Sequence, residues 1–142
     1  MTGDQKKQIL SEFLDRIWSR GDYDAIPDFI AQRYAILNDP GDPWEGQVLD
    51  HPGYRDRIEK SRAPFPDQSF DVVSMLADDD AIAVSWNWQG THLGPVAGFE
   101  ATGKIITMTG MTIYGFEGGL LNSHWQVADR LGVFMQLRAN AA

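Results

Sequence analysis

The chain has 142 residues, 43% of them hydrophobic, which is enough for a substantial core within one domain spanning residues 1–142. Its net charge of -8, with 12 Lys and Arg against 20 Asp and Glu, argues against nucleic acid and anionic membranes as partners, because both are bound largely through basic side chains. There is no cysteine, so disulfides, thiolate catalysis and cysteine-ligated metals are excluded.

The N-terminal segment and the hydropathy of the chain bear on its location. Residues 1–8 are polar and form no apolar signal segment. No stretch approaches the ~18 uninterrupted apolar residues that a membrane-spanning helix needs. We therefore expect a cytoplasmic protein.

The first third of the chain has the apolar spacing of helices. In its first segment apolar residues recur at three- and four-residue intervals, and Gly21 follows as a stop signal. These residues are Ile9, Leu10, Phe13, Leu14, Ile17 and Trp18. A second, shorter helix is predicted from residue 22 or 24 onward, with Pro27 in its first turn. A third is predicted over residues 52–62, after a long loop at 38–51 that is rich in Pro and Gly.

The remainder of the chain alternates between apolar and polar residues, as strands do. Residues 70–76 and 81–92 flank an acidic turn, and residues 104–116 and 120–137 flank a turn that contains Gly-Gly. Both arrangements predict antiparallel hairpins. Helices followed by a run of long strands indicate an α+β domain, in which helices pack on one face of a curved antiparallel sheet and enclose a pocket.

The alternation also predicts which side chains face the pocket. In segment 81–92, Trp86 and Trp88 share the face that we expect to be buried. Segment 104–116 is semi-apolar on both faces, so something should cover each face of the sheet. The helices can cover only one face, and we therefore expect a homodimer through the sheet. The alternative is a monomer in which loop 93–101 folds over the sheet.

One carboxylate falls on the apolar side of the last predicted strand. The residues on that side are Leu121, Ser123, Trp125, Val127, Asp129 and Leu131. An ionised acid buried without a partner is so unfavourable that it takes up a proton or finds a donor. Asp129 is therefore a candidate catalytic acid or base.

Several motifs follow one another along nearly the whole chain. They are Trp18-Ser19-Arg20-Gly21-Asp22, Phe65-Pro66-Asp67, Gly90-Thr91-His92-Leu93-Gly94, Thr102-Gly103-Lys104, Ile113-Tyr114-Gly115-Phe116 and Trp125-Gln126-Val127-Ala128-Asp129. In this order and spacing they resemble the SnoaL-like polyketide cyclase family of the nuclear-transport-factor-2-like (NTF2-like) superfamily. The resemblance implies a cone-shaped α+β barrel whose N-terminal helices pack on a curved sheet.

The resemblance also implies roles for two residues. The acid/base of the cyclases maps onto Asp129, the residue that the strand pattern selects. The cyclases carry a His or Arg facing the cavity where this chain has Gly115, so the acid is expected to lack that polar partner. The alternative role of Asp129 is structural, as an acid satisfied by Trp or Tyr donors in a sealed core.

The other candidate site residues come from the predicted inner faces and from the mouth of the pocket. His92 has a buried parity and is a candidate catalytic residue, or a turn cap, whereas His124 is expected to face outward. The expected substrate-binding residues are Trp18, Tyr34, Asn38, Tyr54, Arg55, Trp86, Trp88, Met111, Gly115 and Trp125.

These observations lead to a cofactor-independent acid/base enzyme as the expected function. It would be a cyclase, isomerase or lyase acting on a small apolar, aromatic or polyketide-like substrate. No metal is expected, because the three His have no carboxylate at ligand spacing. The sequence also has no phosphate loop and no Gly-x-Ser-x-Gly element of a serine hydrolase.

Two alternatives remain open. The first is a non-catalytic binding or assembly module of the same fold. The second is an epoxide hydrolase, a branch of the superfamily that is similar in carrying an acid, an arginine and an acid around one water. That branch is less favoured, because Arg130 has the wrong parity and no second inward acid is apparent in the pattern.

Overall fold

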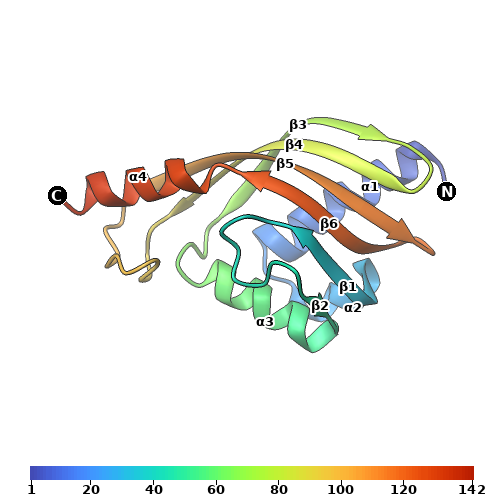
Figure 1. Cartoon of the computed structure of the whole chain (residues 1–142), viewed down its shortest axis with the longest axis horizontal. Coiled ribbons are helices and arrows are strands. Elements are labelled where there is room, and N and C mark those ends of the chain that lie inside the picture. Colours follow the sequence, from blue (N-terminus) through green and yellow to red (C-terminus); the bar gives the residue numbers. More distant parts are fainter.

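The computed structural model describes residues 1–142 and contains four α-helices and six strands (Figure 1). The helices are α1 (Gly3–Phe13), α2 (Ile26–Phe29), α3 (His51–Arg62) and α4 (Arg130–Asn140). A π-helical stretch, Leu14–Ser19, extends α1, and a 3-10 turn, Tyr23–Ala25, precedes α2. The strands are β1 (Ile30–Asn38), β2 (Val48–Leu49), β3 (Ser69–Ala77), β4 (Ala81–Thr91), β5 (Ile105–Glu117) and β6 (Leu120–Ala128).

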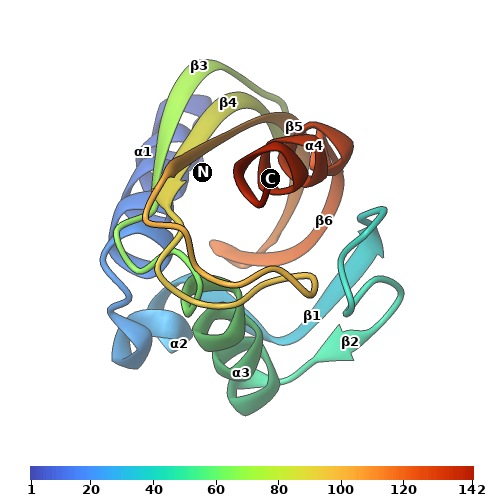
Figure 2. The ribbon, with the colours of Figure 1, turned by 90° about the vertical axis from the view of Figure 1, so that its left-hand side faces the viewer.

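All six strands belong to one sheet with the order β2-β1-β6-β5-β4-β3. Neighbouring strands are antiparallel except β1 and β6, which run parallel. Viewed end-on, the sheet curves into an open arc, with α1 beside β3 and α3 beside β1 (Figure 2). The predicted α+β architecture is therefore confirmed.

The helices begin where the sequence supplies caps. Thr2 and Gln5 form a reciprocal capping box at α1, with N–H to side-chain distances of 2.8 and 3.1 Å. Asp50 caps α3 by accepting a hydrogen bond from the Gly53 N–H at 2.8 Å. The first and third predicted helices are thus confirmed, and the first buries Leu10 and Phe13 completely.

Two elements at the start of the sheet lie where no strand was predicted. β1 follows α2 directly, and β2 lies inside the predicted loop 38–51. The register between β1 and β6 shifts twice, so the buried residues of β1 do not alternate regularly. An irregular pattern of this kind carries no period-2 signal in the sequence.

The prediction for the C-terminal part of the last strand is wrong. β6 ends at Ala128, and the next residue, Asp129, accepts a hydrogen bond from the Gly132 N–H at 2.9 Å. Asp129 is therefore the N-cap of α4, and the residues from 130 onward form a helix instead of a strand.

The predicted inner face is right for β4 and wrong for β6. Trp86 and Trp88 are 3% and 6% exposed, as expected. β5 pairs Gly115 with Ser123 but pairs Phe116 with Leu121, so Asn122 is an extra, bulged residue in β6. Beyond such a bulge, each side chain of β6 points to the face opposite to the one that strict alternation predicts.

This reversal has clear consequences for three residues of β6. His124 is buried at 3% exposure, whereas Trp125 and Val127 are about half exposed on the outer face. Loop 93–101 does not cover that face, because its residues Val96 and Ala97 line the inner cavity. No helix of the protein has the length and hydropathy needed to cross a membrane.

Candidate active site

A cavity of about 560 Å³ lies on the inner side of the curved sheet. Most of its lining residues are hydrophobic, and its aromatic wall comes from α1's extension, β3, β4 and α4. The large apolar side chains of this wall include Trp18, Phe70, Trp86, Trp88 and Phe134. A cavity with this lining suits an apolar or aromatic ligand.

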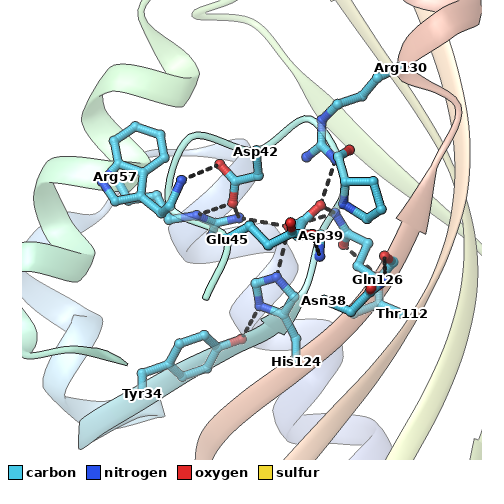
Figure 3. Close-up of polar contacts among 12 residues, drawn as sticks. Tyr34, Asn38, Asp39, Asp42, Glu45, Arg57, Thr112, His124, Gln126 and Arg130 are labelled. Carbon is cyan, nitrogen blue, oxygen red and sulfur yellow. Dashed lines mark hydrogen bonds and ion pairs between the residues drawn. The ribbon is translucent and has the colours of Figure 1, made fainter. Parts of the chain in front are cut away.

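Asp39, at the end of β1, is the centre of a buried polar cluster beside this cavity (Figure 3). Its fully buried carboxylate accepts hydrogen bonds from His124 Nε2 at 2.8 Å, Arg130 Nη1 at 2.6 Å and Gln126 Nε2 at 3.2 Å. Burial alone would raise the pKa of Asp39, but the hydrogen bond from His124 and the charge of Arg130 outweigh it and lower the pKa to about 2. Asp39 is therefore a permanent anion at neutral pH.

His124 connects this carboxylate to a buried tyrosine. Because an ionised carboxylate only accepts, the proton of the imidazole lies on Nε2, and Nδ1 accepts a hydrogen bond from the Tyr34 hydroxyl at 2.7 Å. Burial lowers the pKa of His124 and raises the pKa of Tyr34, so the imidazole and the phenol are both uncharged at neutral pH. Both ring nitrogens of His124 are thus occupied by protein groups.

Arg57, on α3, bridges Asp39 to a second acid. Its Nε and Nη2 donate to Oδ2 of Asp42 at 3.1 and 2.9 Å, and Nη2 also lies 3.4 Å from Asp39 Oδ2. Oδ1 of Asp42 accepts only one long hydrogen bond, from the Trp44 N–H at 3.5 Å. Asp42 is the one carboxylate among the residues that line the cavity.

The loop after β1 has a local reason to place Asp42 there. The Asp42 N–H donates to the carbonyl of Asp39 at 2.9 Å, and Glu45 accepts from the Asp39 N–H at 2.7 Å. Gly41 between them has φ +91°, and a Cβ at that position would lie 2.8 Å from the Arg130 side chain. Any other residue at this position would be strained, so the turn favours glycine.

A second chain of hydrogen bonds fixes the amide of Gln126. Trp86 Nε1 donates to Thr112 Oγ1 at 2.9 Å, and Thr112 Oγ1 donates to Gln126 Oε1 at 2.7 Å. The Gln126 amide nitrogen is then directed at Asp39. Strands β4, β5 and β6 are thus tied to the same carboxylate.

The family is decided by comparison with known proteins. The model of the family described as SnoaL-like polyketide cyclase matches residues 8–137. A candidate polyketide cyclase from Acidithiobacillus ferrooxidans is 48% identical to the chain, with 100% of both chains covered and a TM-score of 0.93. The chain belongs to the SnoaL-like polyketide cyclase family.

More distant members of this fold group are also similar to this SnoaL-like protein. TsrD from Streptomyces laurentii is 23% identical, with 98% of each chain covered and a TM-score of 0.82. IdmH, a candidate polyketide cyclase from Streptomyces antibioticus, is 22% identical, with 94% of this chain and 99% of that chain covered and a TM-score of 0.79. At these identities the likeness shows the shared fold alone. No curated protein matches the chain.

Several residues expected in the site of this SnoaL-like protein do line the cavity. These residues are Trp18, Tyr54, Trp86 and Trp88. Tyr34 is fully buried behind His124, and Asn38 donates to the carbonyl of Gln126 at 3.0 Å. Both therefore support the cluster without lining the cavity. Arg55 is exposed and pairs with Asp24 and Glu59, so its expected place at the cavity mouth is wrong.

The candidate site residues of β5 and β6, and the residue that follows β6, were expected to face the cavity, and they do not. Met111 is 62% exposed and Trp125 is 47% exposed, both on the outer face. The missing Cβ of Gly115 would meet the side chains of Ser123 and Asn122, so this position does not face the cavity. Asp129 is exposed outside the cavity, where it caps α4.

His92 lies inside the protein but outside the cavity lining. It is fully buried, with its ring 5.7 Å from the ring of Phe65, and neither ring nitrogen has a hydrogen-bond partner. Its predicted burial is therefore right. The expected contact with substrate is not present, because the cavity wall does not include it.

The polar cluster itself is what the sequence analysis missed. Its members are Asp39, Asp42, Arg57, His124, Gln126 and Arg130. The expectations that His124 faces outward and that Arg130 has the wrong parity are both wrong. A signal was present in Asp39 and Asp42, two acids in a Pro- and Gly-rich loop directly after an apolar segment.

The same cluster contains the residues best placed to hold a cation. Ligand atoms of Asp39, Asp42 and His124 lie within 4.8 Å of one another. The guanidinium of Arg57 already lies between the two carboxylates, and Arg130 pairs with Asp39. A divalent ion would have to displace these charges, so the arrangement fits an ion-pair network better than a metal site.

Proposed function

We propose that this SnoaL-like protein is an acid/base cyclase or isomerase that acts on an apolar, carbonyl-bearing substrate of aromatic or polyketide-like type in the cavity. The observation that carries this proposal is Asp42, the carboxylate that lines the cavity and keeps one oxygen with only a long hydrogen bond. A base needs such a free oxygen within reach of the substrate. Family membership supports the reaction class.

In the proposed reaction Asp42 Oδ1 takes a proton from the carbon next to a substrate carbonyl. The electron pair of the broken C–H bond moves into the carbonyl, which becomes an enolate. The enolate carbon then attacks a second carbonyl of the same molecule, or takes up a proton at another position. Asp42 returns its proton to the new alkoxide or carbon, so the product is an isomer of the substrate.

The rest of the site supports this step by position. Arg57 holds Oδ2 of Asp42 with two hydrogen bonds and thereby turns Oδ1 away from itself. The walls formed by Trp86 and Trp88 exclude water and restrict the substrate to few conformers. His124 is not the base of this proposal, because both of its ring nitrogens are engaged.

Asp129 has a different role in this proposal from the one that the sequence pattern gave it. Its carboxylate caps α4, the helix that contributes Val133, Phe134 and Leu137 to the cavity. The two acids therefore make a matched pair: Asp42 at the cavity and Asp129 outside it.

The test compares Asp42→Asn with Asp129→Asn. Hydrogen exchange at the acidic carbon of aromatic β-diketones is followed by NMR in heavy water. We expect Asp42→Asn to slow enzyme-dependent exchange by about 100-fold or more, because an amide cannot accept the proton, and Asp129→Asn to leave it unchanged. Full exchange by Asp42→Asn would refute the role of Asp42. Ligand binding without exchange by the wild type would indicate the non-catalytic binding module.

Epoxide hydrolysis is a second candidate that a specific observation favours. The sequence pattern gave no second acid near the cavity, but the fully buried Asp39 lies beside Asp42, with Arg57 between the two carboxylates. In this reaction water gives a proton to Asp42, and the water oxygen attacks an epoxide carbon while the C–O bond at that carbon breaks. Asp42 then returns the proton to the alkoxide, which gives the diol. Turnover in ¹⁸O-water separates the two reactions, because the diol gains one labelled oxygen and the cyclised isomer gains none.

We also propose that a second copy of the chain covers the outer face of the sheet. Cross-strand neighbours form an outer patch there, defined by Leu76, Met111, Ile113, Trp125 and Val127. These side chains are 47–72% exposed, and none carries a charge. The patch itself therefore brings no acids together, although each chain has a net charge of -8.

A further inference from the structure

Two tyrosines of the cavity wall have hydroxyls that no protein group holds in a short, well-aligned hydrogen bond. Tyr54, on α3, and Tyr114, on β5, both line the cavity and are 1% and 6% exposed. Trp18 and Tyr34 lie near the hydroxyl of Tyr54, and Thr112 lies near that of Tyr114, but none of these pairs forms a well-aligned hydrogen bond. The only sealed, unpartnered side-chain polar atoms are the ring nitrogens of His92. The two hydroxyls are therefore accessible from within the cavity.

Both tyrosines belong to the polar end of the cavity. The ring of Tyr54 lies 4.9 Å from that of Tyr34, and the ring of Tyr114 lies 6.1 Å from that of His124. Thr112, the polar neighbour of Tyr114 on its strand, is already engaged with Trp86 and Gln126. The hydroxyls thus lie beside the cluster that holds Asp42 and can turn from these neighbours toward a ligand.

Their protonation state suits hydrogen-bond donation. Burial raises the pKa of both Tyr54 and Tyr114. Each phenol therefore keeps its proton at neutral pH and presents an O–H to the cavity. In an apolar cavity such a donor is worth most to an oxygen that becomes negative during the reaction.

We infer that Tyr54 and Tyr114 are catalytic residues that donate hydrogen bonds to the substrate oxygen on which negative charge develops. This inference rests on the proposed function: as Asp42 takes the proton from carbon, the electron pair moves to the carbonyl oxygen. An enolate oxygen accepts hydrogen bonds more strongly than a ketone oxygen does, so the two donors lower the barrier instead of only binding the ground state. The substrate class is then a ketone whose enolate oxygen lies between α3 and β5.

The test uses 2-naphthol as a probe, because its ionised form resembles an aromatic enolate. Binding is measured in the Asp42→Asn background, in which the amide imitates the uncharged acid that exists after proton transfer. Absorbance distinguishes naphtholate from naphthol, and naphthalene serves as an uncharged probe of the same shape. We expect the bound probe to be more ionised than the free probe at the same pH.

Tyr54→Phe and Tyr114→Phe should each weaken naphtholate binding by about 10- to 100-fold and change naphthalene binding by less than about threefold. Tyr23→Phe is the matched control, because the Tyr23 hydroxyl accepts a hydrogen bond from Arg62 at 3.0 Å and Tyr23 does not line the cavity. It should leave naphtholate binding within about threefold of the parent. Thermal melts check that each variant is folded, and 3-fluorotyrosine at the same site, a stronger donor, should tighten binding.

Unchanged naphtholate binding in both Phe variants would overturn the inference, and so would a parent protein that binds no naphtholate. Either result would leave hydrogen exchange by Asp42 intact. Conversely, exchange that survives Asp42→Asn would reject the proposed base while naphtholate binding still reported on the two tyrosines. The failures of the two proposals are therefore distinguishable.

Discussion

Nε2 of His124 lies 2.8 Å from Oδ2 of Asp39, inside a protein core where neither side chain meets bulk water. The pair makes folding depend on pH. The folded pKa of Asp39 is about 2, below its ordinary value of 3.8, and burial lowers the pKa of His124 below 6.5. For both groups the unfolded chain binds protons more readily, so both contribute stability at neutral pH that is lost on acidification.

We therefore expect the free energy of unfolding to be constant near pH 7–8 and to fall in two stages. The first stage begins below about pH 6.5, as His124 protonates in the unfolded chain, and the second lies between about pH 4 and 2, where Asp39 contributes roughly 2 kcal/mol. Urea unfolding at several pH values measures both stages. His124→Gln should flatten the first stage, and a wild-type slope in that variant would contradict the assignment.

Helix α4 offers a test of the role of Asp129. Asp129→Ala should lower stability by about 1 kcal/mol, because the Gly132 N–H loses its acceptor, whereas Asp129→Asn should be nearly neutral. Gly132→Ala should be nearly neutral, because its Cβ would displace the flexible Asp129 carboxylate from the cap while alanine favours the helix by about as much. Thermal melts compare the three variants. A similar loss in Asp129→Asn and Asp129→Ala would contradict the capping role.

Strand regularity explains what the sequence could predict. β4 pairs with β5 in unbroken register from Ala81 to Thr91, so alternation placed Trp86 and Trp88 correctly. β6 contains the bulge at Asn122, and from there a period-2 pattern assigns each side chain to the wrong face. Because this single extra residue leaves no mark in the apolar pattern, strict alternation predicted Asp129 inside and His124 outside.

The site was hidden for a second reason. Asp39 and Asp42 lie in a loop, and their partners Arg57 and Arg130 come from two different helices. Contacts between residues so distant in sequence depend on tertiary packing and leave no local spacing to detect. Family resemblance fixed the fold, but it transferred the acid to Asp129, which in this chain is a helix cap.

Arg57 should be the most sensitive residue of the cluster. It is 4% exposed and bridges two buried carboxylates, so Arg57→Met leaves them without their shared counter-charge. We expect a loss of about 3–5 kcal/mol in urea unfolding. Arg57→Lys should recover only part of it, because one ammonium cannot reproduce the fork of the guanidinium.

Arg55 provides the matched control for that substitution. It lies two residues earlier on α3 and makes its ion pairs with Asp24 and Glu59 at the surface. Because solvent screens such pairs, Arg55→Met should leave stability within experimental error of the wild type. Equal losses of stability in Arg55→Met and Arg57→Met would show that the loss comes from helix α3 as a whole. They would rule out the ion pairs of Arg57 with the two carboxylates as its cause.

The outer patch leads to a prediction about assembly. Met111 pairs with Val127 across β5 and β6, and Ile113 pairs with Trp125 beside them, so the apolar surface is continuous over two strands. In a symmetric dimer Met111→Glu would bring two uncompensated carboxylates into one interface. Sedimentation should show a dimer for the wild type and a shift toward monomer for Met111→Glu, with affinity at least about 10-fold weaker. Leu93→Glu, at an exposed leucine in the loop between β4 and β5, should stay dimeric, and a monomeric wild type would contradict the proposal.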